Sequence, residues 1–540
     1  MALALGFGLG LVFDGRNGGG LPGTYYDFTG ASLPGPWETL RRSALDTFLG
    51  AGGLLRYNAH NLLRWSEDIS NAVWPGFSGW SATSATQVTV SAGGSNTRQT
   101  ISAGTTAGVS YTLAVTVQKL SGAITQLSAD IGDGATQPIP LTGTTTRVVV
   151  PLVAGASGAF LDLAANAAGS FTITAMQLTI GGGTDYVPTT TAPVYLPSSP
   201  THSAAGAVLG LQVQGQATQY WPKTDSLEDW FTFQSSVTQN NAVSPSGALN
   251  ADTLTLVGSS AIIRNEITIA AGLSLELSGF LRRPVGSATS ALRVTTNDAV
   301  SWGTGQSTLV PLTNNWVRFS LPITTTAATR VVLGKLDASG NPDAAVANGE
   351  VEVWGVNIAP PGSYIPNPGT GTAVRTGDFA GGGISGASLT ALLTPTQPFT
   401  IVLPFRKANN AASVETLLGL CAGASAGTTN QLGIATNGTQ AQLVHSGGSG
   451  ALTGTLVLDG STVNKVAVSV DPAAGKMSIS VNGSAVTETT GIAYTGSGTT
   501  HLIPGARDSS GGQPATGFTS PGIRVASGYI TGSALQALST

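Results

Sequence analysis

The sequence predicts an all-β protein made of several β-sandwich domains in a row. Of its 540 residues, 73 are glycine and only 9% are charged, while 41% are hydrophobic. Glycine, serine and threonine disfavour helices, whereas short strands joined by tight turns accommodate them. The chain is also longer than one hydrophobic core normally supports, so about three or four domains are expected.

A first unit, predicted over residues 61–195, contains segments in which apolar and polar residues alternate. Alternation is typical of strands that bury one face, and the Gly/Ser/Asn clusters between the segments suit the turns of a sandwich. The expected strands lie at Gln87–Ser91, Ser110–Val117, Arg147–Val153 and Phe171–Ile180.

A second unit, predicted over residues 216–370, repeats landmarks of the first in the same order. Trp230 corresponds to Trp74 and Tyr364 to Tyr186, and three strand-like segments between them also recur. Five ordered landmarks indicate an internal duplication, and the period is too long for a solenoid. We therefore expect one strand order in both units. The acidic residues beside the first tryptophans are expected to frame a turn: Glu67, Asp68, Glu228 and Asp229.

The rest of the chain is predicted to form an N-terminal anchor (1–60), a linker (196–215) and a third unit (371–540). Trp37–Leu49 in the anchor has a helical pattern of leucines. The third unit contains two Asn-Gly turns, typical of hairpins, at Asn437 and Asn482, and it ends in a short helix at Ser533–Leu538.

Charge and cysteine content exclude several classes of function. The net charge is −4 and no basic run occurs, so nucleic-acid binding is not expected. No segment approaches the roughly 20 apolar residues of a membrane span, and Ala2–Phe13 lacks the basic start of an export signal. A lone Cys421 and four scattered histidines leave no disulfide and no zinc site, so no metal and no cofactor is expected.

Two weak patterns of catalytic or metal-binding type also occur. Gly423–Gly427 matches the Gly-x-Ser-x-Gly elbow around Ser425, but that elbow needs a strand–turn–helix context and a His/Asp pair. Asp130 and Asp133 offer two carboxylates at a strand end, which suits either calcium or a solvated turn. No catalytic residue is predicted, and the protein is not expected to be an enzyme.

Sugar binding is the chemistry that the loops suit best. A sugar site combines an aromatic face with a few polar groups, and loops commonly carry such sites. The candidate residues are Trp302 in the second unit and four loop residues of the third: Tyr494, His501, Arg507 and Asp508.

The ordered motifs resemble a known family. Asn61-Leu-Leu-Arg-Trp-Ser-Glu-Asp, followed by Asn71-Ala-Val-Trp74, resembles the opening motif of β-sandwich modules in phage virion fibres and head spikes. Phe28-Thr-Gly-Ala-Ser32 precedes it, and Tyr364-Ile-Pro and Ala373–Asp378 follow in the family's order. The last unit is similar to laminin-G and concanavalin-A domains. The resemblance implies two tandem jelly-roll sandwiches, like carbohydrate-binding modules, and a terminal concanavalin-like sandwich.

The resemblance further implies a structural and adhesive fibre or spike of a phage or phage-like particle. Residues 371–540 are expected to contact host cell-surface polysaccharide, and the N-terminal segment other virion proteins. A homo-oligomer, with a trimer favoured, is expected on a virion assembled in the bacterial cytoplasm. The alternatives are a polysaccharide-depolymerising tailspike and a secreted bacterial adhesin.

Overall fold

The protein is described by a computed structural model that covers most of the chain. The residues described are 24–29, 47–50, 55–105, 107–182, 186–196, 201–202, 208–213, 217–298, 302, 305–360, 364–365, 367, 372–375, 383–407, 414–422, 431–445, 448–449, 454–459, 461–505 and 518–540.

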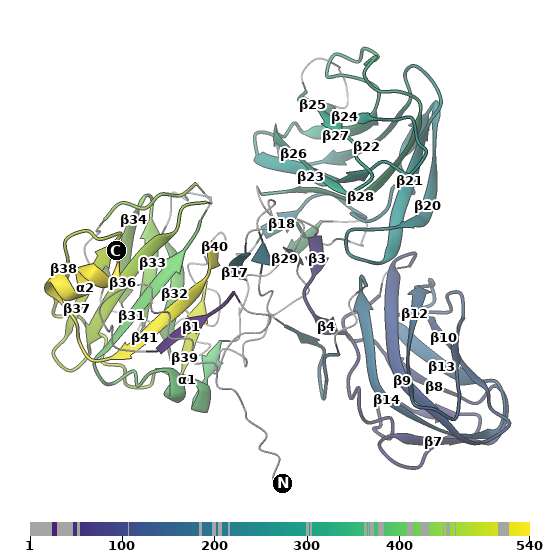
Figure 1. Ribbon diagram of the computed structural model, residues 1–540, viewed down its shortest axis with the longest axis horizontal. Coiled ribbons are helices and arrows are strands. Elements are labelled where there is room, and N and C mark those ends of the chain that lie inside the picture. Colours follow the sequence, from purple (N-terminus) through teal and green to yellow (C-terminus); the bar gives the residue numbers. More distant parts are fainter. Residues whose placement is uncertain are drawn as a thin grey trace, which may run out of the picture.

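The described residues confirm the all-β prediction. They contain 41 strands and two short helices, α1 (Gly386–Leu392) and α2 (Gly532–Leu538). Helix α2 matches the helix expected at the end of the chain. The strands gather in three sandwiches around a central region of short strands (Figure 1). The exact residue limits predicted for the domains stay a prediction.

The first sandwich consists of two five-stranded antiparallel sheets, β12-β9-β14-β7-β6 and β11-β10-β13-β8-β5. Alternate residues of the strands meet in one core that includes Trp74, Val115, Leu163 and Phe171. The strand bounds are β5 (Gly76–Phe77), β6 (Trp80–Ala82), β7 (Gln87–Val90), β8 (Asn96–Thr100), β9 (Ser110–Gly122), β10 (Gln126–Ile131), β11 (Gln137–Pro140), β12 (Thr146–Val153), β13 (Phe160–Ala165) and β14 (Gly169–Ile180).

The second sandwich has the same architecture, with sheets β26-β23-β28-β21-β20 and β25-β24-β27-β22-β19. Adding 14 to each strand number of the first sandwich gives these orders, so the predicted duplication is confirmed. The bounds are β19 (Phe231–Phe233), β20 (Ser235–Val243), β21 (Leu249–Leu256), β22 (Ile262–Thr268), β23 (Ser274–Arg282), β24 (Ala291–Asp298), β25 (Ser307–Pro311), β26 (Val317–Thr324), β27 (Ala328–Gly334) and β28 (Gly349–Ala359).

Hydrogen bonds at the start and end of each sandwich fix which residues correspond. The Ser66 amide donates to the Thr189 carbonyl, and the Thr189 amide donates to the Ser66 hydroxyl. Thr224 and Asn367 form the same two hydrogen bonds in the second sandwich. Tyr186 and Tyr364 both lie three residues before the second member of the pair. Trp74 and Trp230 both lie just before the first strand, so the predicted pairing of these landmarks is confirmed.

The acidic residues of the opening motif do not correspond as predicted. Trp65 and Lys223 share a left-handed backbone, with φ of 50° and 45°. When these two residues are aligned, Glu67 corresponds to Asp225 and Asp68 corresponds to Ser226. Glu228 and Asp229 are therefore not the counterparts of Glu67 and Asp68. Asp68 does frame its turn, because its carboxylate accepts the Ser70 amide at 3.0 Å.

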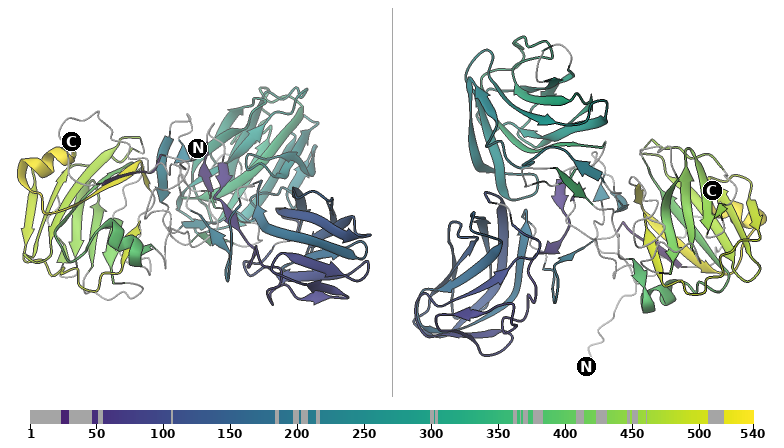
Figure 2. Two further views of the ribbon diagram at one scale, coloured as in Figure 1. Left: turned by 60° about the horizontal axis from the view of Figure 1, so that its bottom comes forward. Right: turned by 180° about the vertical axis from the view of Figure 1, so that it is seen from behind.

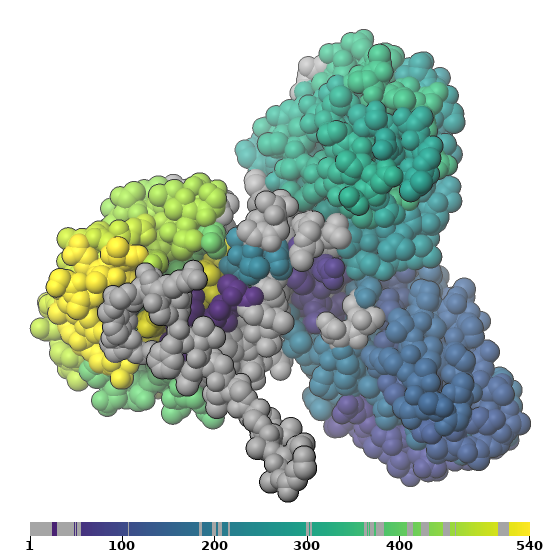
Figure 3. Space-filling model, viewed as in Figure 1, coloured from purple at the N-terminus to yellow at the C-terminus, as the bar shows by residue number. Residues whose placement is uncertain are grey.

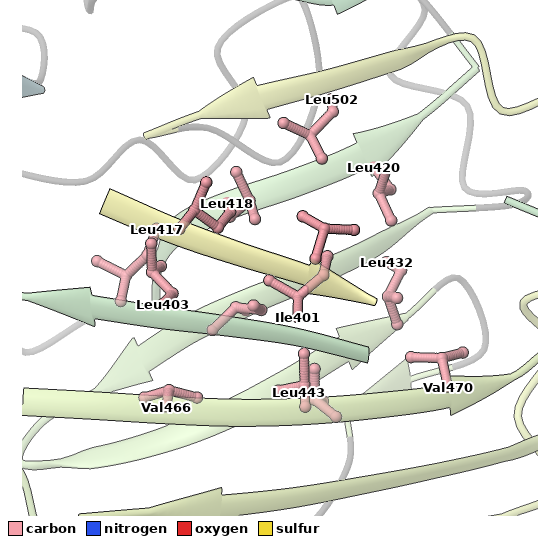
Figure 4. Packing of buried hydrophobic residues seen from close by; sticks show 14 of the residues in the cluster. Ile401, Leu403, Leu417, Leu418, Leu420, Leu432, Leu443, Val466, Val470 and Leu502 are labelled. Atoms are coloured by element: carbon pink, nitrogen blue, oxygen red, sulfur yellow. The ribbon is translucent and has the colours of Figure 1, made fainter. Parts of the chain in front are cut away.

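The third sandwich consists of two six-stranded sheets, β1-β41-β31-β36-β37-β38 and β30-β39-β32-β33-β34-β35. Leucine, isoleucine and valine side chains from both sheets interleave in its core, as Figure 4 shows for Ile401, Leu403 and Leu443. The bounds are β1 (Thr24–Asp27), β30 (Ile384–Ser385), β31 (Phe399–Phe405), β32 (Glu415–Cys421), β33 (Leu432–Asn437), β34 (Gln440–His445), β35 (Gly448–Ser449), β36 (Asn464–Asp471), β37 (Lys476–Val481), β38 (Thr487–Thr490), β39 (His501–Pro504) and β41 (Gly522–Ser527).

Segments from far upstream complete this third sandwich. Strand β1 pairs with β41, and β17 (Val208–Val213), from between the first two sandwiches, pairs with β40 (Phe518–Ser520). Phe28, Leu211 and Val213 are at most 2% exposed and belong to its core. Both views of Figure 2 show β1, in purple, against the yellow C-terminal strands. Residues 24–28 of the predicted N-terminal anchor are thus held by the chain's own last sandwich.

The remaining strands are short pairs in the central region. They are β2 (Thr47–Leu49) with β3 (Leu55–Tyr57), β4 (His60–Asn61) with β15 (Val194–Tyr195), β16 (Thr201–His202) with β17, and β18 (Ala217–Gln219) with β29 (Ala373–Arg375). The helix predicted at Trp37–Leu49 is wrong at its described end, because Thr47–Leu49 pairs as a strand with β3. Phe48 and Leu49 fit an extended strand as well as a helix, and the pairing with β3 decides between them.

The space-filling view shows the three sandwiches as three lobes, with the first (blue) and the second (teal) in contact (Figure 3). Among the described residues, no helix is long and apolar enough to span a membrane.

The upstream contribution to the third core can be tested at Phe28. The Phe28→Ala variant is expected to destabilise the third sandwich by about 3–5 kcal/mol, because it removes a fully buried ring. Tyr25→Ala, on the same segment but 43% exposed, is the control and should cost less than about 1 kcal/mol. Hydrogen exchange of β31 and β36 in the full chain measures the difference, and equal protection in both variants would contradict this account.

Candidate functional site

The predicted sugar-binding residues of the third sandwich do not form an exposed cluster among the described residues. The ring of Tyr494 is fully buried in the core, and its hydroxyl accepts a bond from Thr499 Oγ1 at 3.4 Å. This corrects the expectation that Tyr494 offers a stacking face. His501 lies on β39, half-buried, with Nδ1 2.8 Å from Thr500 Oγ1. Arg507 and Asp508 lie outside the described residues, as does Ser425.

Trp302 lies on the second sandwich. It is partly buried and packs against an apolar cluster formed by Ile262, Val332 and Leu336. Ile262 and Val332 belong to β22 and β27, and they point away from the core of the sandwich. The indole therefore covers part of the outer surface of the β25-β24-β27-β22-β19 sheet.

The outer surface of that sheet and its counterpart in the first sandwich share one pattern. We call them face 1 and face 2. The central row of face 1 crosses all five strands of the β11-β10-β13-β8-β5 sheet: Phe77, Asn96, Ala164, Ser128 and Pro138. The matching row of face 2 crosses β19, β22, β27, β24 and β25: Phe231, Arg264, Val332, Thr295 and Ser307.

Each row begins with an exposed aromatic ring on the edge strand. Phe77 is 48% exposed and Phe231 is 53% exposed. Leaving a phenylalanine half in water gives up part of its burial free energy, which is about 1.5–3 kcal/mol for a whole side chain. Both sandwiches do so at the same position. The Arg264 guanidinium lies 4.7 Å from the Phe231 ring centre, which orients the ring from one side.

An ion pair occupies the next row of each face. On face 1, Arg98 donates two bonds to Asp162, at 2.7 and 2.5 Å, and lies 3.7 Å from the Phe160 ring centre. On face 2, Arg330 Nε donates to Glu266 at 2.8 Å. These rows combine directional donors and acceptors with an aromatic surface.

A group of carboxylates extends the ion-pair row of face 1. Asp130, Asp133 and Asp162 bring oxygen atoms within 4.8 Å of one another. Burial, and then the Asp162 carboxylate, raise the pKa of Asp130. The sequence indicated Asp130 and Asp133, but Asp162 joins them only because β13 pairs with β10. Oxygen ligands of this type suit calcium, although Arg98 already neutralises Asp162.

A shallow hollow of about 120 Å³ lies beside face 2. It is lined by Pro222, Lys223, Ser226, Asp229, Trp230 and Asn265. Lys223 and Asp229 form an ion pair across it. Because Trp230 directly precedes Phe231, the hollow borders the edge of face 2 that carries the exposed ring.

Two of the four histidines, His60 and His445, are partly or fully buried by the strands around them. His60 is 1% exposed, its Nδ1 lies 2.7 Å from the Asn58 carbonyl, and its Nε2 accepts the Ile180 amide at 2.9 Å. Burial lowers the pKa of His60 to about 4, and the Asn58 carbonyl opposes this shift. His445 lies at the end of β34, and burial lowers its pKa as well.

Comparisons with known proteins return structural similarity at a low level. No protein-family model matches the chain, and no curated protein matches it. Similar solved structures include the CBM40 module of a Ruminococcus gnavus sialidase bound to α2,3-sialyllactose. It is 15% identical, with 28% of this chain and 86% of that chain covered and a TM-score of 0.24.

Two further similar structures are also carbohydrate-binding modules. The tandem CBM22 domains of Paenibacillus barcinonensis Xyn10C are 12% identical, with 56% of this chain and 97% of that chain covered and a TM-score of 0.20. A CBM4 module is 12% identical, with 26% of this chain and 90% of that chain covered and a TM-score of 0.19. Similarity at this level leaves the function to be argued from the residues of this chain.

The buried histidine gives a testable dependence on pH. Unfolded His60 binds a proton near pH 6.5, whereas the folded residue does so only near pH 4. The stability that it contributes is therefore complete above pH 6.5 and is lost as the pH falls toward 4, by roughly 3 kcal/mol. Hydrogen exchange of β14, corrected for the intrinsic rate, should show this loss in the wild type. A His60→Gln variant that loses as much protection as the wild type over this range would refute the assignment.

Proposed function

We propose that this chain is a non-catalytic adhesion protein that binds polysaccharide through face 1 and face 2. The observation that carries the proposal is the exposed ring, Phe77 or Phe231, at one equivalent position in both sandwiches and beside a row of charged groups. An aromatic ring stacks on the apolar face of a sugar, while guanidinium, amide and carboxylate groups bond to its hydroxyls.

Repetition of the face supports binding to a polymer. A single flat face offers few contacts, so its affinity for one sugar is expected to be low. Two faces on one chain raise the effective concentration of the second contact once the first has formed. Oligomerisation, with the trimer expected from the sequence, would multiply the faces further. Trp302, which packs against the cluster that includes Val332 of the central row, remains a candidate contact on face 2.

The distribution of carboxylates favours adhesion over cleavage. A glycosidase places an acid and a second carboxylate on opposite sides of the bond to be cleaved. Among the described residues, the one group of three carboxylates lies along a single sheet face, and Arg98 engages one member. The depolymerase alternative predicts release of reducing ends from a bound polysaccharide, and the adhesion proposal predicts none.

The location on a phage or phage-like virion is a proposal that rests on the motif resemblance. Mass spectrometry of purified particles should find the chain in them, whereas a secreted adhesin would be found in culture medium without particles. The receptor contact expected in residues 371–540 also stays a prediction. We place the sugar contacts on the first two sandwiches because the buried Tyr494 ring cannot stack on a ligand.

The proposal is tested by removing the two rings. Phe77→Ala and Phe231→Ala should each weaken binding of the full chain to a bound polysaccharide about fivefold, since a stacking contact contributes about 1 kcal/mol. The double variant should lose about the product of the two factors, roughly 25-fold, because the combined affinity of two linked contacts scales with the affinity of each. Glycan-array screening identifies the polysaccharide, and affinity electrophoresis gives the change in affinity.

Matched controls lie on the other sheet of each sandwich. Val149→Ala and Val243→Ala remove exposed apolar side chains, 46% and 50% exposed, from β12 and β20. They should leave binding unchanged. Equal losses in the controls, or full binding by the Phe77/Phe231 double variant, would refute the proposal.

A further inference from the structure

We propose that the two faces accept sugars of different charge, with face 1 taking a neutral sugar and face 2 a carboxylate-bearing sugar held by Arg264. This inference rests on the proposed function, because it assigns a substrate class to each of the two faces.

Backbone hydrogen bonds establish which residues of the two faces correspond. Ile101 N donates to Ala159 O at 2.9 Å, and Ile269 N donates to Ala327 O at 3.3 Å. Both bonds lie one residue beyond the end of the corresponding strand, β8 or β22. Counting back along β8 and β22 from these bonds pairs Asn96 with Arg264. The same strand register fixes three further pairs: Arg98 with Glu266, Asp162 with Arg330, and Asp130 with Asn297.

The ion pair is therefore retained with its polarity reversed. Face 1 has the arginine on β8 and the carboxylate on β13, whereas face 2 has the carboxylate on β22 and the arginine on β27. Face 1 adds a second carboxylate, Asp130, so its two central rows hold two carboxylates and one guanidinium, a formal charge of −1, and Asp133 in the turn after β10 brings a third carboxylate to the group.

Face 2 has the opposite sign. Its two central rows hold Arg264, Arg330 and Glu266, which is two guanidinium groups and one carboxylate, a formal charge of +1. A third arginine, Arg293, is balanced by Asp343 in its own ion pair. A bound anion therefore meets an attractive field on face 2 and a repulsive one on face 1.

Arg264 is the cation on face 2 that a ligand can reach. Its side chain is 31% exposed, whereas that of Arg330 is 9% exposed. Glu266 accepts from Arg330 at 2.8 Å but lies 3.8 Å from Arg264, so its carboxylate is committed mainly to Arg330. The Arg264 guanidinium also lies against the Phe231 ring, next to the sugar that would stack there. A planar guanidinium in this position can bind a sugar carboxylate through two parallel bonds.

The equivalent position on face 1 cannot do this. Asn96 carries no charge, and the neighbouring carboxylates of Asp130 and Asp133 accept hydrogen bonds from sugar hydroxyls but repel an anionic sugar. Arg98 is occupied by both oxygens of Asp162. A neutral, hydroxyl-rich sugar is therefore the ligand that suits face 1.

The experiment uses the full chain and a glycan array in which each acidic glycan stands beside its neutral counterpart. Suitable pairs are polygalacturonate with its methyl ester, and sialylated with desialylated oligosaccharides. Arg264→Gln is expected to weaken binding to the acidic members about tenfold, equivalent to about 1.4 kcal/mol, and to leave the neutral members unchanged. Phe77→Ala is expected to weaken the neutral members. Added salt should weaken acidic binding by the wild type more than by the variant.

A control and a gain-of-function variant complete the design. Arg283→Gln removes the same charge from the turn after β23, outside face 2, and should change neither class. In a Phe231→Ala background, Asn96→Arg with Asp130→Asn copies face 2 residues onto face 1 and should transfer acidic binding to it.

Each outcome decides a different point. Neutral binding that depends on Phe77 and Phe231, with no acidic glycan bound or with Arg264→Gln indistinguishable from wild type, would overturn this inference and leave the proposed function standing. An array on which the wild type binds no glycan would overturn both.

Discussion

A buried side-chain amide holds the opening segment against the last strand in each of the first two sandwiches. Asn61 is fully buried and makes four bonds, donating to the carbonyls of Met176 and Val187 and accepting the amides of Leu63 and Leu178 at 2.9–3.1 Å. Gln219 occupies this position in the second sandwich, where it accepts the amides of Trp221 and Ile358. Leaving such an amide unpaired would cost about 1–3 kcal/mol, which favours this path of the chain into the sandwich. The left-handed turn, the core tryptophan and the edge strand with its exposed phenylalanine come next along the chain, in that order, in both sandwiches.

The sequence was sufficient for the features that local pattern determines. Alternation predicts a strand at Ser110–Val117, which the structure extends to Gly122 as β9, and the ordered landmarks predict the shared topology. It failed where distant segments decide the outcome. Face 1 joins residues of five strands, and nothing in the spacing of Asp130 and Asp162 shows that they are neighbours. The glycine and serine residues around Tyr494 predict a loop, whereas its ring is buried in the third core. The pairing of β1 with β41 spans almost the whole chain and has no local signal.

The reversed ion pair shows why duplicated sandwiches can diverge on this surface. The core must keep its packing, so Trp74 and Trp230 remain equivalent and buried. A partly exposed ion pair contributes up to about 1 kcal/mol, and its direction across two strands makes little difference to that contribution. The charge on the outer surface can therefore change sign while the fold is unaffected. Face 2 has Arg264 at the position where face 1 has Asn96. This difference is a change of this kind, and it alters which ligand the face can bind.

The three sandwiches are tied together more closely than domains on flexible linkers. Tyr57, before the first sandwich, donates to Asp225 at the start of the second at 3.2 Å, and Tyr364 donates to the same carboxylate at 2.8 Å. Burial raises the pKa of Asp225, and the two phenols and Thr224 oppose that shift by bonding to the ionised form. Gly182 N also donates to Ser246 O across the two sandwiches at 3.2 Å. Strands β1 and β17 then attach this pair to the third core. Because these contacts limit how face 1 can move relative to face 2, less conformational entropy is lost when one polymer occupies both, and the second contact forms at a lower free-energy cost than it would across a flexible linker.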